Sequence, residues 1–170
     1  MKLIFILFFG INLFVYGQTN DWNSLEKTEF SIQYPKHWTI DESGRMGTKF
    51  IIFSPLSDVK DIFKDNVNFI IQDLIGHKIS LKEYTEISKR QIKSMITDSE
   101  ILLCTTEKSH NLNFQKLIYT GRQGVYLLHF IQYYWVENNK AYILTFTTET
   151  AQFDRYKDIG NRILSSFKIK

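Results

Sequence analysis

Residues 125–136 read VYLLHFIQYYWV, and both faces that this segment would present as a β-strand are mostly apolar. Val125, Leu127 and every second residue after them share one face, while Tyr126, Leu128 and their alternates share the other. A half-buried strand would instead alternate apolar with polar residues. The segment therefore predicts a central strand whose sheet is covered on both sides by helices or long loops. The aromatic residues that we expect in the core, rather than on an exposed stacking platform, are Tyr133, Tyr134 and Trp135.

Three further strands are predicted around this one, at Glu100–Glu107, Leu112–Arg122 and Lys140–Thr148, with the central strand at Val125–Val136. The connections on either side of the central strand carry Gly and Asn, which supply the positive φ that tight hairpins need. Neighbouring strands should therefore run antiparallel. The first of these segments contains Cys104, the single cysteine of the chain, which excludes an internal disulfide. We expect this thiol to be buried as a small apolar side chain and not to act as a nucleophile.

The region from Glu29 to Ile75 also favours strands, because apolar and polar residues alternate along much of it. Pro35 interrupts the first alternation, and a bend is expected there because proline cannot donate a hydrogen bond to a sheet. Strands are predicted at Phe30–Tyr34, Trp38–Ile40, Lys49–Phe53 and Asn66–Ile75, with a loop at Ser54–Asp65.

Two helices are predicted. Ser80 and Glu83 form a capping box that opens the first, which runs to about Thr97. The second runs from about Ala151 to Ser165. The order of elements predicts an α+β fold, an antiparallel β-sheet with helices packed on both faces. The first helix should bury the residues that recur at helical spacing, Tyr84, Ile87, Ile92, Met95 and Ile96.

Residues 1–17 have the pattern of a secretory signal peptide. Lys2 precedes an apolar run, and Gly17 offers a cleavage point before Gln18. The run is shorter than the about 20 apolar residues that a spanning helix needs, so we favour cleavage over a retained anchor. No cysteine lies at the cleavage point, so no lipid anchor is expected. We predict export to the periplasm or the medium, with residues 18–170 as a single domain that has no integral membrane anchor after cleavage.

The charge of the chain is nearly balanced. There are 21 Lys and Arg against 18 Asp and Glu, and loss of Lys2 with the leader leaves 20 against 18, a net charge of +2. A nucleic-acid-binding domain would show a concentrated basic stripe. Nucleic acid is therefore not expected as a partner.

Several motifs together resemble the PsbP-like (Mog1/PsbP/DcrB) family. They are FSIQYPKHW at 30–38, NVN at 66–68, SLKEY at 80–84, AYILTF at 141–146 and ILSSF at 163–167. The resemblance implies an antiparallel sheet between helices, and it implies no reaction because these motifs are structural. The family includes extrinsic subunits of photosystem II, a nuclear-transport regulator and exported bacterial proteins. Lys36 and His37 stand where glycine often precedes the tryptophan, and the leader is of the secretory type, so a photosynthetic role is not expected.

The sequence contains no recognisable catalytic constellation. The four histidines, among them His129, lack the paired spacing of a zinc site. His129 lies between apolar residues and is expected to be a hydrogen-bonded core histidine. No G-x-S-x-G motif and no glycine-rich phosphate loop occur. We therefore predict that the protein is not an enzyme and has no catalytic residues.

One local group of carboxylates, Asp58, Asp61 and Asp65, provides the only candidate metal ligands. Calcium favours several oxygen ligands on a flexible loop. The spacing is not that of an EF-hand, and the interleaved Lys60 and Lys64 offset the negative charge. A solvated loop is therefore favoured, and no cofactor is predicted, with calcium as the alternative.

Two functions remain open from the sequence. The leading prediction is an exported, non-catalytic accessory or binding protein that engages an envelope or secreted protein partner through a sheet face or the 54–65 loop. Candidate partner-binding residues are His37, Trp38 and Trp135. The alternative is a small-ligand or calcium-binding module that uses the 54–65 loop or a pocket between sheet and helix.

Overall fold

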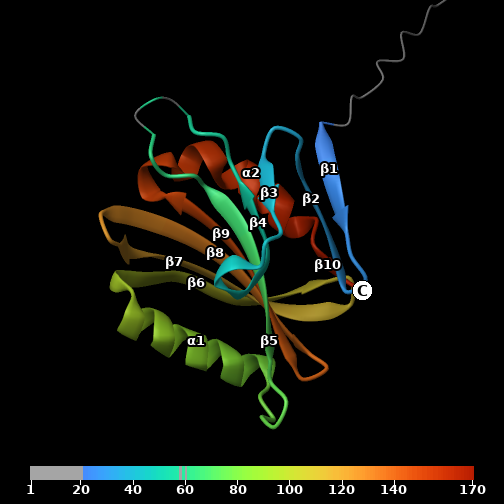
Figure 1. Ribbon diagram of the computed structural model, residues 1–170. Helices are drawn as coiled ribbons and strands as arrows, with labels where there is room; N and C mark the ends of the chain where they lie inside the picture. Colours follow the sequence, from blue (N-terminus) through green and yellow to red (C-terminus); the bar gives the residue numbers. More distant parts are fainter. Residues whose placement is uncertain (1–20, 58, 60) are drawn as a thin grey trace, which may run out of the picture.

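The computed structural model describes residues 21–57, 59 and 61–170 (Figure 1). The predicted signal peptide, residues 1–17, lies outside the described residues. The described chain folds into two antiparallel sheets and two α-helices.

The larger sheet has seven strands in the order β3-β4-β5-β9-β8-β7-β6. Strands β7, β8 and β9 are joined by tight hairpins in which Gly124, Asn138 and Asn139 adopt positive φ, so the predicted antiparallel pairing is confirmed. The strands are β3 (Thr39–Asp41), β4 (Thr48–Phe53), β5 (Asn66–Asp73), β6 (Thr97–Ser109), β7 (Leu112–Gln123), β8 (Tyr126–Glu137) and β9 (Lys140–Glu149).

A second sheet of three strands, which the sequence pattern did not predict, has the order β1-β2-β10. Its strands are β1 (Trp22–Glu26), β2 (Phe30–Pro35) and β10 (Lys168–Ile169). Phe30 and Ile32 of β2 belong to the same buried cluster as Phe69 of β5 and Leu144 of β9. The two sheets therefore share one core.

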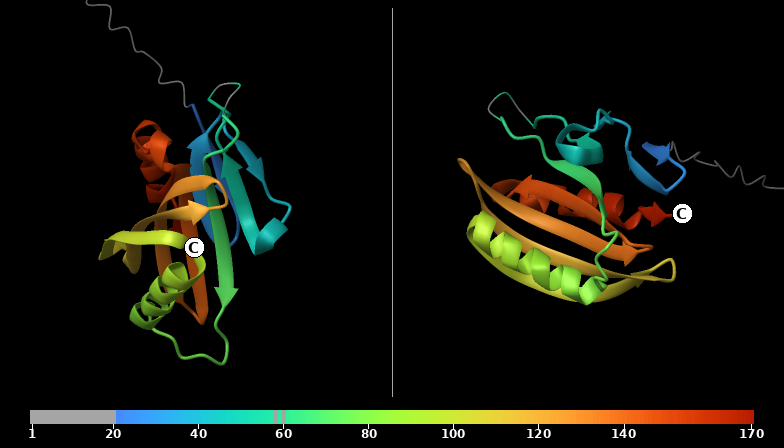
Figure 2. Two further views of the ribbon diagram at one scale, coloured as in Figure 1. Left: turned by 90° about the vertical axis from the view of Figure 1, so that its left-hand side faces the viewer. Right: turned by 60° about the horizontal axis from the view of Figure 1, so that its bottom comes forward.

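The helices cover opposite faces of the larger sheet, which confirms the predicted fold class (Figure 2). Helix α1 (Leu81–Met95) packs against β6, β7 and β8, whereas α2 (Phe153–Ser165) packs against β9, β5 and β2. Ile131 and Trp135 of β8 lie in the cluster on the α2 side, and Leu128 and Tyr134 lie in the cluster on the α1 side. Strand β8 is thus buried on both faces from Leu128 to Trp135, as predicted, whereas Val125 and Leu127 at the start of the predicted segment are exposed.

The buried face of α1 differs in part from the predicted one. Ser80 and Glu83 form the expected capping box, and Tyr84 and Ile92 are buried. Met95, the last residue of the helix, is 79% exposed, and Ile96 after it is only partly buried against the core. The small residues Thr85 and Ser88 are buried in addition, and their hydroxyls donate to the carbonyls of Leu81 and Tyr84 in the preceding turn.

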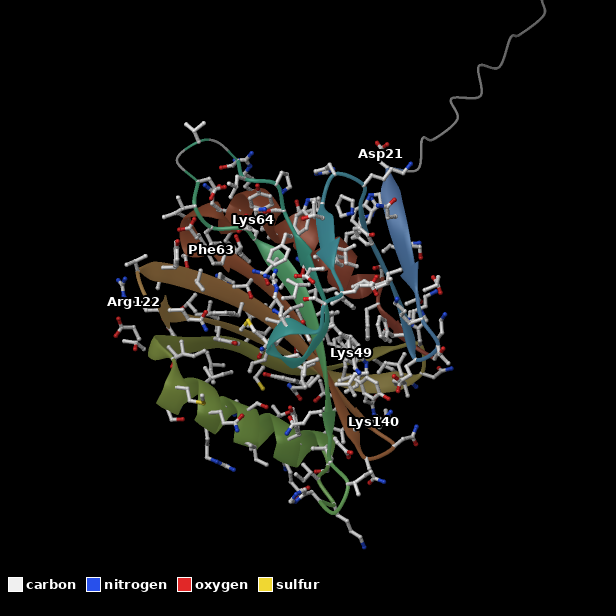
Figure 3. All side chains as sticks on the ribbon, in the orientation of Figure 1. Asp21, Lys49, Phe63, Lys64, Arg122 and Lys140 are labelled. Atoms are coloured by element: carbon white, nitrogen blue, oxygen red, sulfur yellow. The ribbon has the colours of Figure 1, made fainter. Side chains whose placement is uncertain are left out.

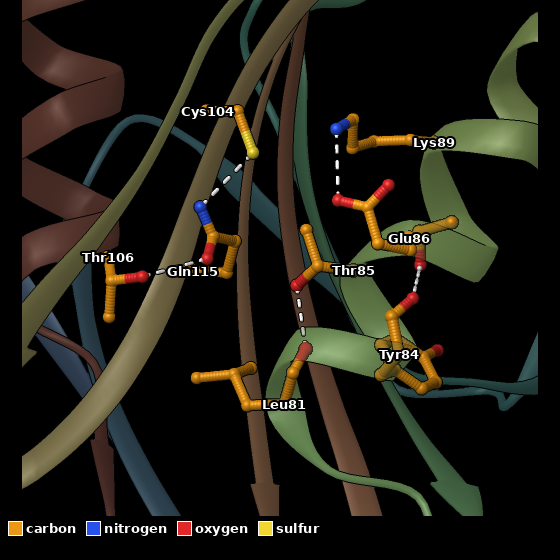
Figure 4. Close-up of polar contacts among 9 residues, drawn as sticks. Leu81, Tyr84, Thr85, Glu86, Lys89, Cys104, Thr106 and Gln115 are labelled. Carbon is orange, nitrogen blue, oxygen red and sulfur yellow. Dashed lines mark hydrogen bonds and ion pairs between the residues drawn. The ribbon is translucent and has the colours of Figure 1, made fainter.

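The prediction that Cys104 is buried is wrong. Strand β6 is an edge strand with β7 on one side only, and Cys104 is exposed together with Leu102 and Leu103 before it. Figure 4 shows the Cys104 Sγ accepting a hydrogen bond from the Gln115 Nε2, 3.2 Å away. The Thr106 hydroxyl donates to the Oε1 of the same Gln115 amide at 3.0 Å.

Candidate functional site

A pocket of about 510 Å³ lies on the face of the larger sheet that also carries α1. Helix α1 covers part of β6–β8 on this face, and the pocket lies beside it over β4, β5, β8 and β9, with Tyr119 and Gln123 of β7 also in its lining. We call it the sheet-face pocket. No residue of α1, all of which the structure describes, lines it. This pocket is not the one expected between sheet and helix, because it lies beside the helix on the open sheet.

Uncharged polar side chains cross the floor of the pocket in two adjacent rows. Asn68 of β5 lies opposite Thr145 of β9, which lies opposite Gln132 of β8. Asn66 of β5 lies opposite Thr147 of β9 in the next row. Residues directly opposite each other on antiparallel strands point to the same face, so these five side chains gather without any help from a loop.

The polar floor is held in place from the α1 side. The Gln132 Nε2 donates to the Thr145 Oγ1 at 3.0 Å, and the Gln132 Oε1 accepts from the Tyr134 hydroxyl. Burial raises the pKa of Tyr134, so its hydroxyl stays protonated and can donate. The Tyr134 ring packs on Tyr84 of α1, with ring centroids 5.7 Å apart. Packing beneath the helix therefore orients a polar group in the pocket.

The two asparagines keep hydrogen-bonding capacity. The Asn68 Nδ2 donates to the Asn66 Oδ1 at 3.4 Å, and the Asn66 Nδ2 donates to the Lys64 carbonyl at 3.2 Å. Each amide nitrogen carries two N–H groups, so these bonds leave one N–H on each for a ligand.

Apolar side chains form the walls of the pocket. Phe53 of β4 and Phe63, in the loop just before β5, lie at its rim, and Phe130 lies at the β8 side. Figure 3 labels Phe63 where the loop enters β5. Arg45 and Met46, in the 3₁₀ turn η1 (Arg45–Gly47), close another side.

Arg45 is the one charged side chain among the described residues that line the pocket. Its guanidinium lies 2.8 Å from the Asp41 carboxylate and above the Phe53 ring, 5.1 Å from the ring centroid. The described lining also contains no His, Cys, Asp, Glu or Lys to act as a base. Tyr119 also lines the pocket, and burial raises the pKa of its hydroxyl, so it is present as the neutral phenol.

The acidic loop is placed differently from the prediction. Asp58 lies outside the described residues. Asp61 accepts hydrogen bonds from the backbone N–H groups of Ser57 (2.7 Å) and Phe63 (3.1 Å), which organise the loop. Asp65 is buried, with 2% of its surface exposed, so a wholly solvated loop is not observed.

Asp65 lies in an unfavourable environment for a charge. The Ser54 hydroxyl approaches its Oδ2 at 3.4 Å, while its Oδ1 has no hydrogen-bond partner within the described part of the chain. Burial raises the pKa of Asp65 and the neighbouring Asp61 carboxylate adds to this, while the Thr148 hydroxyl and the Glu149 backbone oppose it without reversing the direction. Among residues 21–57, 59 and 61–170, no three His, Cys, Asp or Glu side chains form a group that could hold a metal ion.

The predicted partner-binding residues do not form one site. His37 is exposed in the turn after β2. Trp38 is buried against Tyr156 of α2, with ring centroids 6.2 Å apart, and Trp135 is buried against Phe114. Both tryptophans therefore belong to the core and present no surface to a partner.

His129 is a core residue, as expected, and lies between Thr120 of β7 and Thr148 of β9 in the sheet. Its ring stacks on Phe153 with centroids 3.6 Å apart, and its Nε2 has no hydrogen-bond partner among the described residues. Burial lowers the pKa of His129, which favours the neutral imidazole. No hydrogen-bonded role is observed for this nitrogen.

Sequence reasoning missed the pocket, although it left a trace in the sequence. Strands β5 and β9 lie inside the sheet, yet each carries polar residues at alternate positions, in Asn66-Val67-Asn68 and Thr145-Phe146-Thr147. A polar alternation in an internal strand indicates that one face is open at that point.

Comparison with protein-family models finds no match to this chain, and comparison with curated proteins finds none either. Solved structures do match. Cyanobacterial PsbP (CyanoP) from Synechocystis sp. PCC 6803 superposes with a TM-score of 0.67 at 15% identity, over 91% of this chain and 96% of that one. LpqN of Mycobacterium tuberculosis, described as involved in cell envelope biogenesis, gives 0.67 at 12% identity, over 89% and 92%.

A protein of unknown function from Pseudomonas aeruginosa, PA94, described as a putative regulator, gives a TM-score of 0.58 at 14% identity, over 85% of this chain and 94% of that one. At such identities the likeness concerns the fold alone. Among the described residues, no helix is long and apolar enough to span a membrane.

Proposed function

Because the chain has the Mog1/PsbP-like fold, we propose that it is an exported, non-catalytic binding protein whose sheet-face pocket holds an uncharged component of the cell envelope. The observation that carries the proposal is the pocket itself. A polar floor with walls of aromatic and aliphatic side chains is typical of small-molecule sites, and its volume falls in the usual range of about 300–1,000 Å³.

Three further observations support the proposal. The apolar leader at residues 1–17 is typical of an exported protein. One protein of similar fold, LpqN, is described as involved in cell envelope biogenesis. The described pocket lining lacks a side-chain base, which favours binding over catalysis.

The test is to purify the protein natively from the envelope or medium fraction of its own cells and to weigh it by native mass spectrometry. We expect the natural chain to carry a bound species. Asn68→Trp, which places a large ring over the polar floor, should abolish that species. Asn113→Trp, at an exposed position of β7 outside the pocket, should retain it. An empty natural chain, or equal loading of both variants, would contradict the proposed function.

Export is tested separately with a copy tagged at the C-terminus. We expect the tagged protein to leave the cytoplasm and to begin near Gln18, as shown by fractionation and N-terminal sequencing. Recovery of the full chain from the cytoplasm would contradict export.

A further inference from the structure

The described lining of the sheet-face pocket is nearly all uncharged. The one charged side chain of the described lining, Arg45, is paired through its Nε with the Asp41 carboxylate at 2.8 Å, so part of its charge is already offset. A cation needs carboxylate ligands, and the described lining contains none. This lining suits a ligand that carries its polarity in neutral groups.

The polar floor offers both donors and acceptors. Asn66 and Asn68 each keep an N–H group that the bonds described above do not use, and amide and hydroxyl oxygens lie beside them. A sugar hydroxyl both donates and accepts, so it can bind an amide through two complementary hydrogen bonds. A row of amides and hydroxyls across three strands suits a ligand with several hydroxyls along one edge.

The walls suit the remaining surface of such a ligand. Phe53, Phe63 and Phe130 border the polar rows, and Ile70 and Ile143 form an apolar row on the other side. Sugar rings present C–H faces between their hydroxyl edges, and these faces pack on aromatic and aliphatic side chains.

The polar floor is also preorganised. Gln132 is held by the Tyr134 hydroxyl and in turn holds the Thr145 hydroxyl at 3.0 Å. A ligand therefore meets groups that are already oriented, which reduces the entropy lost on binding.

From these observations, and resting on the proposed function, we propose that the ligand of the sheet-face pocket is a neutral carbohydrate, with Asn66 and Asn68 as its principal hydrogen-bonding residues.

The test is titration of the protein with three neutral trisaccharides, maltotriose, cellotriose and chitotriose, followed by amide chemical shifts in NMR spectra. We expect at least one to bind and to shift amides of β5 and β9. Asn68→Leu should weaken binding about tenfold, the effect of losing one hydrogen bond to a ligand. Asn68→Asp, which keeps the shape of the side chain, should also weaken it. Asn113→Leu, outside the pocket, should leave it unchanged.

Two comparison probes keep the outcomes distinct. A tri-galacturonate, which carries negative charge, and a tripeptide blocked at both ends should bind more weakly than the best neutral sugar. Equal or tighter binding of either probe would overturn the carbohydrate proposal. The proposal would also be overturned if none of the three trisaccharides bound with a Kd below about 10 mM. If the natively purified protein still carried a species that Asn68→Trp abolishes, the proposed function would stand while the carbohydrate assignment fell.

Discussion

Asp65 is a buried carboxylate whose environment opposes its charge. It is buried, its Oδ1 lacks a hydrogen-bond partner among the described residues, and burial raises its pKa above the ordinary value of 3.8. The unfolded chain therefore loses this proton more readily than the folded chain, so the stability that Asp65 contributes falls as pH rises above 3.8. We predict that Asp65→Asn raises the free energy of unfolding by about 1 kcal/mol near pH 7. The gain should vanish near pH 3, as measured by urea unfolding.

Asp61 supplies a control of opposite sign. Its carboxylate accepts from two backbone N–H groups, and the hydrogen bond from Ser57 is the largest cause of its lowered pKa. Asp61→Asn should therefore destabilise the protein near pH 7. A loss of stability in Asp65→Asn would contradict the account of Asp65. Stabilisation of the natural chain by calcium, absent from Asp65→Asn, would instead support the calcium alternative.

At the scale of elements, the contact between α2 and β9 depends on a residue without a side chain. A Cβ at Gly160 would lie 2.6 Å from the ring of Phe146, which is fully buried. We predict that Gly160→Ala destabilises the protein by about 1–3 kcal/mol, because the core must shift to admit the methyl group. Urea unfolding measures this change.

The predicted loss of stability in Gly160→Ala is informative, because helix propensity alone would make alanine more stable than glycine by about 1 kcal/mol. Asn161→Ala, one residue along the same helix and half-buried, gains propensity without meeting Phe146. It should be neutral or stabilising. Equal stabilisation by both substitutions would show that α2 does not approach β9 this closely.

The sequence predicted elements better than it predicted what each element buries. Strand β8 was recognisable because its two apolar faces require cover on both sides, and the start of α1 because Ser80 and Glu83 satisfy each other's backbone groups. Cys104 was misplaced because an apolar run does not reveal that its strand lies at an edge. Thr85 and Ser88 were missed because their hydroxyls are satisfied within the helix, which a hydrophobic pattern does not register.

At the scale of the whole molecule, what escaped prediction is what distant segments build together. The second sheet joins β2 to β10, so Phe30 pairs with Ile169, from the opposite end of the sequence. A strand as short as β10 has too few residues to show an alternating pattern. The sheet-face pocket combines side chains of several strands. Alternation identifies which residues share a face of one strand, but the strand order that brings Asn68 beside Thr145 and Gln132 is a property of the fold.

The same long-range packing predicts that the described chain unfolds as one cooperative unit, although it has two sheets. Phe167, just before β10, contacts Phe30 of β2, Phe69 of β5 and Trp135 of β8, so the small sheet cannot open without exposing the core of the large one. We predict that Leu144→Ala, a truncation in β9, lowers stability by about 2–5 kcal/mol. In native-state hydrogen exchange, the free energy of opening measured at the slowest amides of β2 and of β9 should fall by this same amount. Unchanged protection in β2 beside lowered protection in β9 would instead show two separate units.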